Sequence, residues 1–480
     1  MGIALSVDKA IGHAAERTVR RHHGRRLRRL GWGRALEPPD GGLWAAGDPP
    51  PREGCSLEVL VDGAEALPRL AAELRSARSH VHLAGWYVSP DFALTRGPER
   101  IELRSLLARL AERIPVRMLV WAGSPLPLFH PDRRDVDGVR HALTFGTKIE
   151  LATDARERPL HCHHEKLVVI DDRIAFVGGI DLTTYAGDRF DSSAHEARGD
   201  VGWHDALCVV RGPAVADVAA HFRERWGSVT GDELPPPRRA RRAGDVDVQV
   251  VRTVPERLYE PVRGGEFRIL EAYTRALRSA ERFIYLENQF LWSSEICRIL
   301  ERKVAQPPSD DFRLVVLLPA NPNDGGDDTR GQLADLIECD GGAGRVLACS
   351  LLALGELGPS PVYVHAKVGI VDDRWLTLGS ANLNEHSLFN DTEVNVVTCD
   401  PELARKTRLR LWGEHLQRPL GEVSGDPVRV VDELWKPIAE EQDDRRRRGQ
   451  PPTHRLCLLP HVSRRTRRLL GPLQGLLVDG

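Results

Sequence analysis

The feature that most constrains this chain is a short polar pattern that occurs twice. HHEKLVVIDD, at residues 163–172, and HAKVGIVDD, at residues 365–373, both contain a histidine, then a lysine, then an aspartate in H-x-K-x4-D spacing. The chain of 480 residues contains 18 histidines and only seven lysines, so a His-x-Lys-x4-Asp pattern should rarely arise by chance. Two copies in one register therefore indicate an internal repeat. The separation is 201 residues at every position of the pattern: His164 to His365, Lys166 to Lys367 and Asp171 to Asp372.

The repeat extends beyond the pattern. GGID at residues 178–181 falls in register with GSAN at 379–382. Apolar periodicity predicts paired helices and paired buried strands in the same order in both halves. The expected helices are 64–77 and 266–280, with later ones ending near 227 and 413; the expected strands are 80–86 and 283–289, 116–121 and 313–318, 205–210 and 393–397.

Strands that alternate with helices predict an α/β fold. We expect two similar α/β/α sandwich halves with mixed sheets, related by a pseudo-two-fold axis, with one shared active site at their interface. The expected division is a basic N-terminal arm, a first half, a Pro/Arg linker, a second half, and a C-terminal extension with a basic tail: 1–55, 56–231, 232–245, 246–420 and 421–480.

The N-terminal arm has two interpretations. Residues 3–32 could be a solvated arm, or a basic amphipathic helix that rests on an anionic membrane surface. The chain contains no run of about 18 apolar residues, and the arm lacks the order of segments in a secretory signal. The sequence therefore predicts a cytoplasmic protein that is peripheral at the membrane surface. Within the fold, residues 1–55 and 440–480 are expected to lie at the periphery, with Arg445–Arg448 a solvated segment.

Composition narrows the partners and cofactors. A net charge of −2 and an aromatic content of 6% argue against a nucleic-acid partner. The eight cysteines have no C-x-x-C spacing and are expected to be reduced, buried thiols. Neighbouring side chains of HCHH, residues 161–164, point to opposite faces of an extended chain, so we expect no metal there.

The paired pattern suits cleavage of a phosphodiester. Such a reaction needs a nucleophile on one side of phosphorus, a proton donor for the leaving oxygen on the other, and positive charge on the remaining oxygens. Two histidines can fill the first two roles, and Lys166 and Lys367 the third, without a metal or other cofactor. Each histidine then needs a carboxylate to fix its tautomer.

The paired motifs resemble those of the phospholipase D superfamily, over about residues 56–415. GGIDL at 178–182, DRFD at 188–191, GWHD at 202–205 and IYLENQF at 284–290 are similar to phospholipase D enzymes proper. Nothing in the chain resembles the C2 domain of the plant members, and the first half carries Gly-Gly-Ile-Asp where the second carries Gly-Ser-Ala-Asn.

The resemblance implies a covalent phosphohistidine that is passed to water or an alcohol. It implies His164 as nucleophile, His365 as acid and base, and Asp205 and Glu393 as the acids that orient the histidines. Lys166, Lys367 and Asn382 would bind the substrate phosphate. Asp171 and Asp372 are counted with the catalytic set, although they close strands and are expected to act more as structural pins.

The predicted function is hydrolysis or exchange of the headgroup of a glycerophospholipid at a membrane surface, by a monomer. A cardiolipin synthase-like phosphatidyltransferase and a nuclease of the superfamily are the alternatives, and a catalytically inactive scaffold is the non-enzyme alternative. Loops 122–135 and 320–332 are expected to frame the pocket. Asp324–Asp328 would be the metal site to consider if a divalent ion proved necessary.

Overall fold

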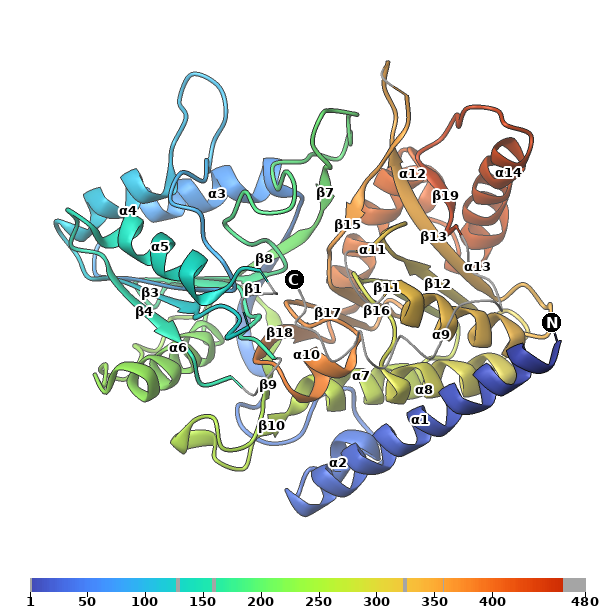
Figure 1. Cartoon of the computed structure of the whole chain (residues 1–480), viewed down its shortest axis with the longest axis horizontal. Coiled ribbons are helices and arrows are strands. Elements are labelled where there is room, and N and C mark those ends of the chain that lie inside the picture. The colour runs from blue at the N-terminus through green and yellow to red at the C-terminus, as the bar shows by residue number, and fades with distance from the viewer. Residues whose placement is uncertain (1, 127–129, 158–160, 323–325, 357, 461–480) are drawn as a thin grey trace.

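The computed structural model describes residues 2–126, 130–157, 161–322, 326–356 and 358–460 (Figure 1). The side chains of residues 2–13, 15 and 326–328 fall outside that description.

The first half is built on a seven-stranded mixed sheet. Its central strands are short, apolar and almost wholly buried, as expected for strands with helices on both faces, whereas the edge strands β1 and β4 are partly exposed. The spatial order is β1 (Arg52–Val61), β8 (Ala206–Arg211), β6 (Ile174–Gly178), β5 (Leu167–Ile170), β2 (Val81–Gly85), β3 (Val116–Trp121) and β4 (Glu150–Asp154). Strands β2, β3 and β4 are parallel, and the other neighbours are antiparallel.

The second half repeats this sheet strand for strand. The order is β9 (Val246–Val254), β18 (Glu393–Thr398), β17 (Trp375–Gly379), β16 (Val368–Val371), β11 (Phe283–Glu287), β12 (Arg313–Leu317) and β13 (Val346–Ala353), with the same parallel and antiparallel neighbours. The predicted fold of two similar α/β halves with mixed sheets is therefore confirmed.

The two sheets meet where β1 pairs with β9, at Arg52 with Val248 and Cys55 with Val246. A two-residue strand, β10 (Glu266–Phe267), also pairs with β9, and β14 (Ser360–Pro361) pairs with β13. No pairing within the described chain joins β4 to β13, so the strands form two linked open sheets rather than a closed barrel.

The helices repeat as well. The outer face of the first sheet carries α3 (Gly63–Arg75), α4 (Leu103–Ala111) and α5 (Arg133–Thr144), and that of the second carries α7 (Arg268–Ser279), α8 (Ser294–Ala305) and α9 (Gly326–Cys339). A third apolar core joins the inner faces of both sheets with α6 (Val215–Thr230) and α11 (Pro401–His415). The halves therefore share one continuous core.

At the N-terminus the structure has a long helix, α1 (Gly2–Arg29), followed by the short α2 (Gly33–Leu36). Helix α1 lies along α8, and α2 lies against α7 (Figure 1). His23 stacks on Phe389 with ring centroids 4.0 Å apart, and the Arg26 guanidinium pairs with Glu256 at 2.7 Å. The solvated-arm interpretation is therefore wrong, because one side of the helix is packed. No helix of the described chain has the length and apolar content needed to cross a bilayer.

The C-terminal extension is also part of the fold. It consists of α12 (Leu420–Val423), α13 (Pro427–Val430), a π-helical turn (Val431–Trp435), α14 (Lys436–Arg447) and β19 (Leu456–Leu458). Strand β19 pairs antiparallel with β13 and extends the second sheet. The peripheral position predicted for residues 440–480 agrees with the side chains of Arg446, Arg447 and Arg448, which are 53–72% exposed, but Leu456–Leu458 belong to the second sheet. Residues 461–480 lie outside the described residues.

The expected linker, 232–245, contains no helix or strand, and β9 begins directly after it. None of the eight cysteines, all within the described residues, is part of a disulfide, as predicted. Their predicted burial holds for five of them; Cys339 is exposed, while Cys399 and Cys457 are partly exposed.

We expect Trp435→Ala to lower the free energy of unfolding by about 3–5 kcal/mol, because it removes a large buried aromatic side chain. Trp435 is 0% exposed and packs on Trp412 and Tyr285 with ring centroids 5.7 and 5.9 Å apart. Urea denaturation measures the change. Leu420→Ala, at a side chain 57% exposed in the same extension, is the control and should change stability little. Equal effects would mean that the extension does not stabilise the fold through this core.

Candidate active site

Each motif lies at the start of a buried strand. His164 and Lys166 precede β5, and His365 and Lys367 precede β16. Because β5 runs antiparallel to β2, and β16 to β11, both pairs lie at the carboxyl ends of the parallel strands. All four residues are at most 4% exposed. The segments 122–135 and 320–332 follow β3 and β12 at that same edge, but they are not loops throughout, because α5 begins at Arg133 and α9 at Gly326. Residues 127–129 and 323–325 lie outside the described chain.

The backbone of each motif is held by the other half. The His164 N–H donates to the carbonyl oxygen of Thr392 at 3.0 Å, and the His365 N–H donates to that of His204 at 2.8 Å. Strand β15 (Tyr363–Val364) pairs with β7 (Trp203–His204) in the same way. Both histidines therefore lie at the interface between the halves.

The orienting carboxylates are exchanged between the halves too. His164 Nδ1 is 2.9 Å from Glu393 Oε1, and His365 Nδ1 is 2.7 Å from Asp205 Oδ2. A proton held on each Nδ1 leaves Nε2 with the lone pair that a nucleophile or base needs. The sequence predicted both acids, and the structure adds that each one serves the histidine of the opposite half.

The difference between Gly-Gly and Gly-Ser in the two copies has a local cause. Ser380 donates its hydroxyl to Glu393 Oε2, and Ser387 donates to Oε1 at 2.6 Å. At the equivalent position of the first half, a Cβ on Gly179 would lie 2.2 Å from Asp205 Oδ1. The shorter carboxylate of Asp205 thus approaches the backbone, which requires glycine, while the longer Glu393 accepts from a serine.

The two lysines have different partners. Lys166 Nζ lies 3.1 Å from Asp181 Oδ2, whereas Lys367 Nζ donates to the amide oxygen of Gln289 at 3.3 Å. Asn382, in register with Asp181, donates to the same amide oxygen at 3.2 Å. Burial lowers the pKa of Lys367 to about 7; the nearby Asp205 carboxylate opposes this shift and the Lys166 charge adds to it.

Burial also shifts the pKa values of His365 and of Asp205, its hydrogen-bond partner. Burial, followed by the charges of Lys367 and Lys166, holds the pKa of His365 well below its usual value. Burial raises the pKa of its partner Asp205 to about 6, against the opposing charge of Lys367. A phosphate anion between the lysines would offset their charge and favour the imidazolium form of His365.

Other residues at the site had no role assigned from the sequence. Arg189 is buried, with its guanidinium 3.2 Å from the centroid of the Trp203 ring, and burial lowers its pKa to about 10. Trp203 in turn lies 4.6 Å from the His365 ring, centroid to centroid. Gln289 donates to the Tyr363 hydroxyl at 2.9 Å. Arg189, Trp203 and Gln289 lie in DRFD, GWHD and IYLENQF, so their signal was the similarity of those segments.

The motif aspartates lie away from this group. Asp171 accepts from the backbone N–H groups of Arg78, Ser79 and His80, at 2.7–3.1 Å. Asp372 binds the N–H groups of residues 281–283 in the same way. A four-residue strand, about 13 Å long, separates each aspartate from its lysine. Asp171 and Asp372 therefore do not belong with the catalytic residues. They fix the backbone at the far end of each strand, as structural pins.

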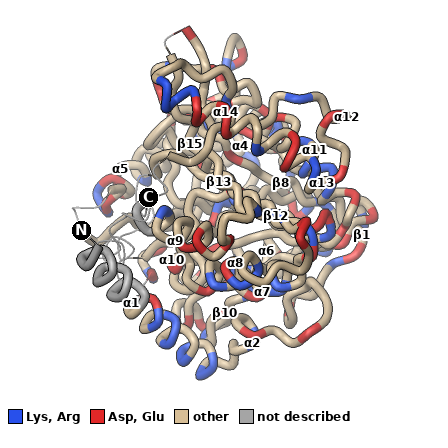
Figure 2. The backbone as a smooth tube through the Cα atoms, turned by 90° about the vertical axis from the view of Figure 1, so that its right-hand side faces the viewer, with Lys and Arg blue, Asp and Glu red and all other residues tan. Residues whose placement is uncertain are grey.

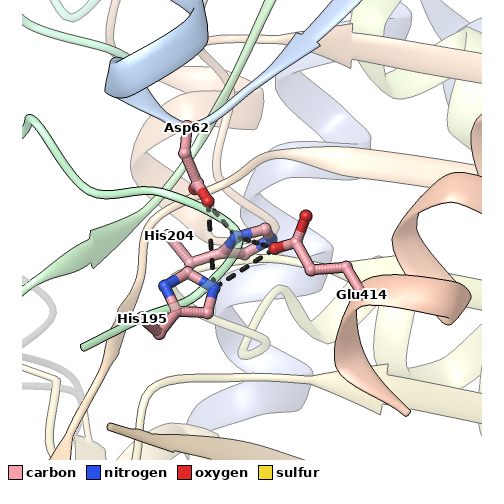
Figure 3. A group of neighbouring side chains, drawn as sticks. All are labelled: Asp62, His195, His204 and Glu414. Atoms are coloured by element: carbon pink, nitrogen blue, oxygen red, sulfur yellow. Dashed lines mark hydrogen bonds and ion pairs between the residues drawn. The ribbon is translucent and has the colours of Figure 1, made fainter. Parts of the chain in front are cut away.

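A buried charged network surrounds His204, whose carbonyl oxygen accepts a hydrogen bond from the His365 N–H. Figure 3 shows four of its members, Asp62, His195, His204 and Glu414. His204 lies 3.0 Å from Asp62 through Nδ1 and 3.1 Å from Glu287 through Nε2. His195 bonds Asp191 and Glu414, and although burial opposes it, these carboxylates raise the pKa of His195 to about 9. Asp62, His195, His204 and Glu414 bring possible ligand atoms within 4.8 Å of one another, and in the structure these atoms are engaged in hydrogen bonds and ion pairs among the four side chains.

Two more features bear on metal binding. His163 and His164 bond different partners, Thr392 and Glu393, so HCHH does not converge on one point. His161, His386 and Asp391 do bring ligand atoms within 4.8 Å of one another. In that group the two Nδ1 atoms of the histidines are 2.9 Å apart, a distance explained by one proton shared between the rings.

The arrangement defines a class of protein: a duplicated α/β fold with one site, to which each half contributes a histidine, a lysine and the acid of the other histidine. Residues 273–412 match the family described as "Cardiolipin synthase, PLD-like domain". Together with the paired motifs and the curated relatives, this match makes the chain similar to proteins of the phospholipase D superfamily.

Phospholipase D A of Dictyostelium discoideum is 26% identical over 76% of this chain and 36% of its own length. Phospholipase D2 of Bos taurus is 25% identical over 74% of this chain and 50% of its own length, so the chain spans half or less of these relatives. The crystal structure of phosphatidylserine synthase of Haemophilus influenzae matches with a TM-score of 0.50 and 12% identity, over 77% of this chain and 86% of that one. At that identity, the match supports the fold alone.

We expect the affinity of the site for tungstate, a phosphate analogue, to fall as the pH rises through about 7, where Lys367 loses its proton. Below that pKa the ammonium attracts the anion. Above it, binding should weaken by about tenfold per pH unit. Calorimetric titration of the purified chain measures this, and Lys367→Arg, which keeps its charge, should bind with a smaller pH dependence than the wild type, because only the contribution of Lys367 is removed. An unchanged affinity in the wild type between about pH 6 and 9 would contradict the lowered pKa of Lys367.

Proposed function

We propose that the chain is a phospholipase D-type phosphodiesterase that hydrolyses or exchanges the headgroup of a glycerophospholipid through a covalent phosphohistidine. The observation that carries the proposal is the reciprocal pairing of His164 with Glu393 and His365 with Asp205 beside two buried lysines. Nothing in this set is needed for folding alone, because burying two histidines, two lysines and two acids together costs desolvation energy.

In the first step, Nε2 of His164 attacks phosphorus and the bond to the headgroup oxygen breaks. His365 donates its proton to that oxygen, so the alcohol leaves neutral, while Lys166 and Lys367 balance the charge on the non-bridging oxygens. In the second step, His365 takes a proton from water or an alcohol, whose oxygen attacks phosphorus and releases His164. Asp205 stabilises the imidazolium form of His365 and Glu393 that of His164.

Glycerophospholipids are the proposed substrates because the curated relatives are named phospholipase D. A phosphatidyltransferase is the second candidate, favoured by the cardiolipin synthase description of the matching family. The two differ in the acceptor, water or an alcohol, which the loops after β3 and β12 would select. Action at a membrane surface, a cytoplasmic location and a monomeric state remain proposals, as does the use of Asp324–Asp328 only if a divalent ion is required.

A product screen tests the function. The purified chain is incubated with phosphatidylcholine, phosphatidylethanolamine and phosphatidylglycerol, with and without an added alcohol and with EDTA. A phospholipase D-type enzyme should release the headgroup and form phosphatidic acid, or the phosphatidyl alcohol where alcohol is present. Cardiolipin from phosphatidylglycerol would support the second candidate. Absence of turnover, or activity that EDTA abolishes and a divalent ion restores, would count against the proposal.

Substitution of the two histidines should have different effects on turnover and on formation of the covalent adduct. His164→Ala should abolish both turnover and any trapped adduct, because it removes the nucleophile. His365→Asn should lower turnover of phospholipids by about 10²–10⁴-fold, the usual effect of losing a general acid. With a nitrophenyl phosphodiester, whose leaving group needs no proton, the same variant should still form the adduct and accumulate it.

Acid quenching, digestion and mass spectrometry locate the phosphoryl group. Asp171→Asn, in a structural pin away from the histidines, is the matched control and should leave the position of the adduct unchanged. An adduct on His365 of the wild type would reverse the assignment of roles. The absence of any adduct under trapping conditions would exclude the covalent route.

A further inference from the structure

A basic groove runs between α1 and the helices α7 and α8. It has a volume of about 480 Å³ and shares no residue with the catalytic site. Five arginines of α1 line it: Arg17, Arg20, Arg21, Arg25 and Arg28. We call this the arginine groove; Figure 2 shows basic residues following one another along the described part of α1.

The opposite wall of the arginine groove is also basic. Arg278 of α7 and Arg298 and Arg302 of α8 face the arginines of α1 across it. These charges repel one another: after burial, the charges of Arg20 and Arg302 contribute to lowering the pKa of Arg298. Facing rows of arginines do not stabilise the fold, because repulsion between like charges opposes the compact state.

The arginines of the groove are poorly neutralised by the protein itself. Within the described chain, Arg17, Arg21 and Arg302 have no carboxylate partner. The two acidic residues of the lining are Glu37, which pairs with Arg28 at 3.4 Å, and Glu295. Burial and the nearby Glu385 raise the pKa of Glu295 well above its usual value, which favours its neutral form.

We propose that the arginine groove binds the phosphate groups of anionic lipids, and so holds the chain on a membrane surface through α1. Guanidinium groups bind phosphate oxygens in bidentate geometry, and an array of them is suited to several phosphates at once. The site is additional to the catalytic one and does not depend on the proposed reaction.

The length of the array favours a surface over a single small anion. From Arg17 to Arg28 the helix rises by about 17 Å, which is longer than one phosphate compound of ordinary size. A second hollow, of about 560 Å³, adjoins the other side of α1 and shares Arg21 and Arg25 with the groove. The positive charge therefore continues around the helix, as it should where a layer of headgroups is the ligand.

The helix that carries these arginines also contacts the catalytic region. His23 lies 3.2 Å from Glu385 at the start of α10 (Glu385–Phe389), and Arg26 donates to the carbonyl oxygen of Phe389 at 2.9 Å. The same short helix provides Ser387, which donates to Glu393. Binding at α1 would thus bring a membrane close to the element that supports His164.

Cosedimentation of the full chain with vesicles tests the proposal. Vesicles of phosphatidylcholine are compared with vesicles in which about one third of the lipid is phosphatidylglycerol. The test variant carries Arg17→Gln, Arg21→Gln, Arg298→Gln and Arg302→Gln. The control variant carries the same change at four exposed arginines away from the groove: Arg75, Arg113, Arg239 and Arg241. Both variants lose four positive charges, so they differ only in where the charge is removed.

We expect the wild type and the control variant to bind the anionic vesicles alike, and more tightly than neutral ones, with an affinity that falls as salt is added. The test variant should bind at least about 100-fold more weakly, since each basic residue at an anionic surface contributes about fivefold. Equal thermal unfolding of the variants shows that folding is intact. Because binding is measured without turnover, failure of the proposed reaction would leave this result unaffected.

Three results would overturn the proposal. The first is equal loss of binding in the test and control variants, which would indicate a general charge effect. The second is binding of soluble inositol hexakisphosphate by the wild type without binding of anionic vesicles, which would assign the groove to a free phosphate ligand. The third is tighter binding of a short DNA duplex than of vesicles through the same four arginines, which would assign it to nucleic acid.

Discussion

The hydrogen bond between each catalytic histidine and a carboxylate of the opposite half is the contact on which the site depends. His164 is oriented by Glu393, and His365 by Asp205. Neither half could hold its own histidine in the required tautomer. Removing either acid would leave a buried imidazole without its partner, a change that commonly costs several kcal/mol. The duplicated fold, the shared inner core and the exchanged backbone contacts all serve to keep these two bonds in place.

Much of the fold could be predicted because the two copies confirm each other. The expected strand at 116–121 is β3 to the residue, and the strand at 313–318 is β12 with one residue fewer. A short apolar run that stands alone can be either a buried strand or a buried helix segment. A run that recurs in the same order beside the same motif can be assigned as a strand. The membership of His164, Lys166, His365 and Lys367 in one site followed from the chemistry, since one histidine cannot act as both nucleophile and acid.

The remainder could not be predicted because it depends on contacts between distant parts of the chain. The packing of α1 rests on Arg26 reaching Glu256 and Phe389, more than 200 residues away, and local sequence carries no signal for it. Strand β19 is three residues long and becomes a strand only by pairing with β13. Arg189 stands in a loop, where charge alone suggests a solvated side chain, yet it stacks on Trp203 beside His365.

The connector at residues 232–245 contains no helix or strand. The halves that it joins have one continuous core, are linked by the pairing of β1 with β9, and exchange the hydrogen bonds that orient the two histidines. The connector is fastened to the first half by hydrogen bonds from Arg238 N–H to Asp172 and from Ala243 N–H to the Gly54 carbonyl oxygen, but it places no residue in the site. Its contribution to the site is therefore to keep the second half at a high local concentration around the first. The geometry of the site does not require the halves to be covalently joined. A chain divided there would face the same association equilibrium as two subunits, and its catalytic competence would become a property of concentration.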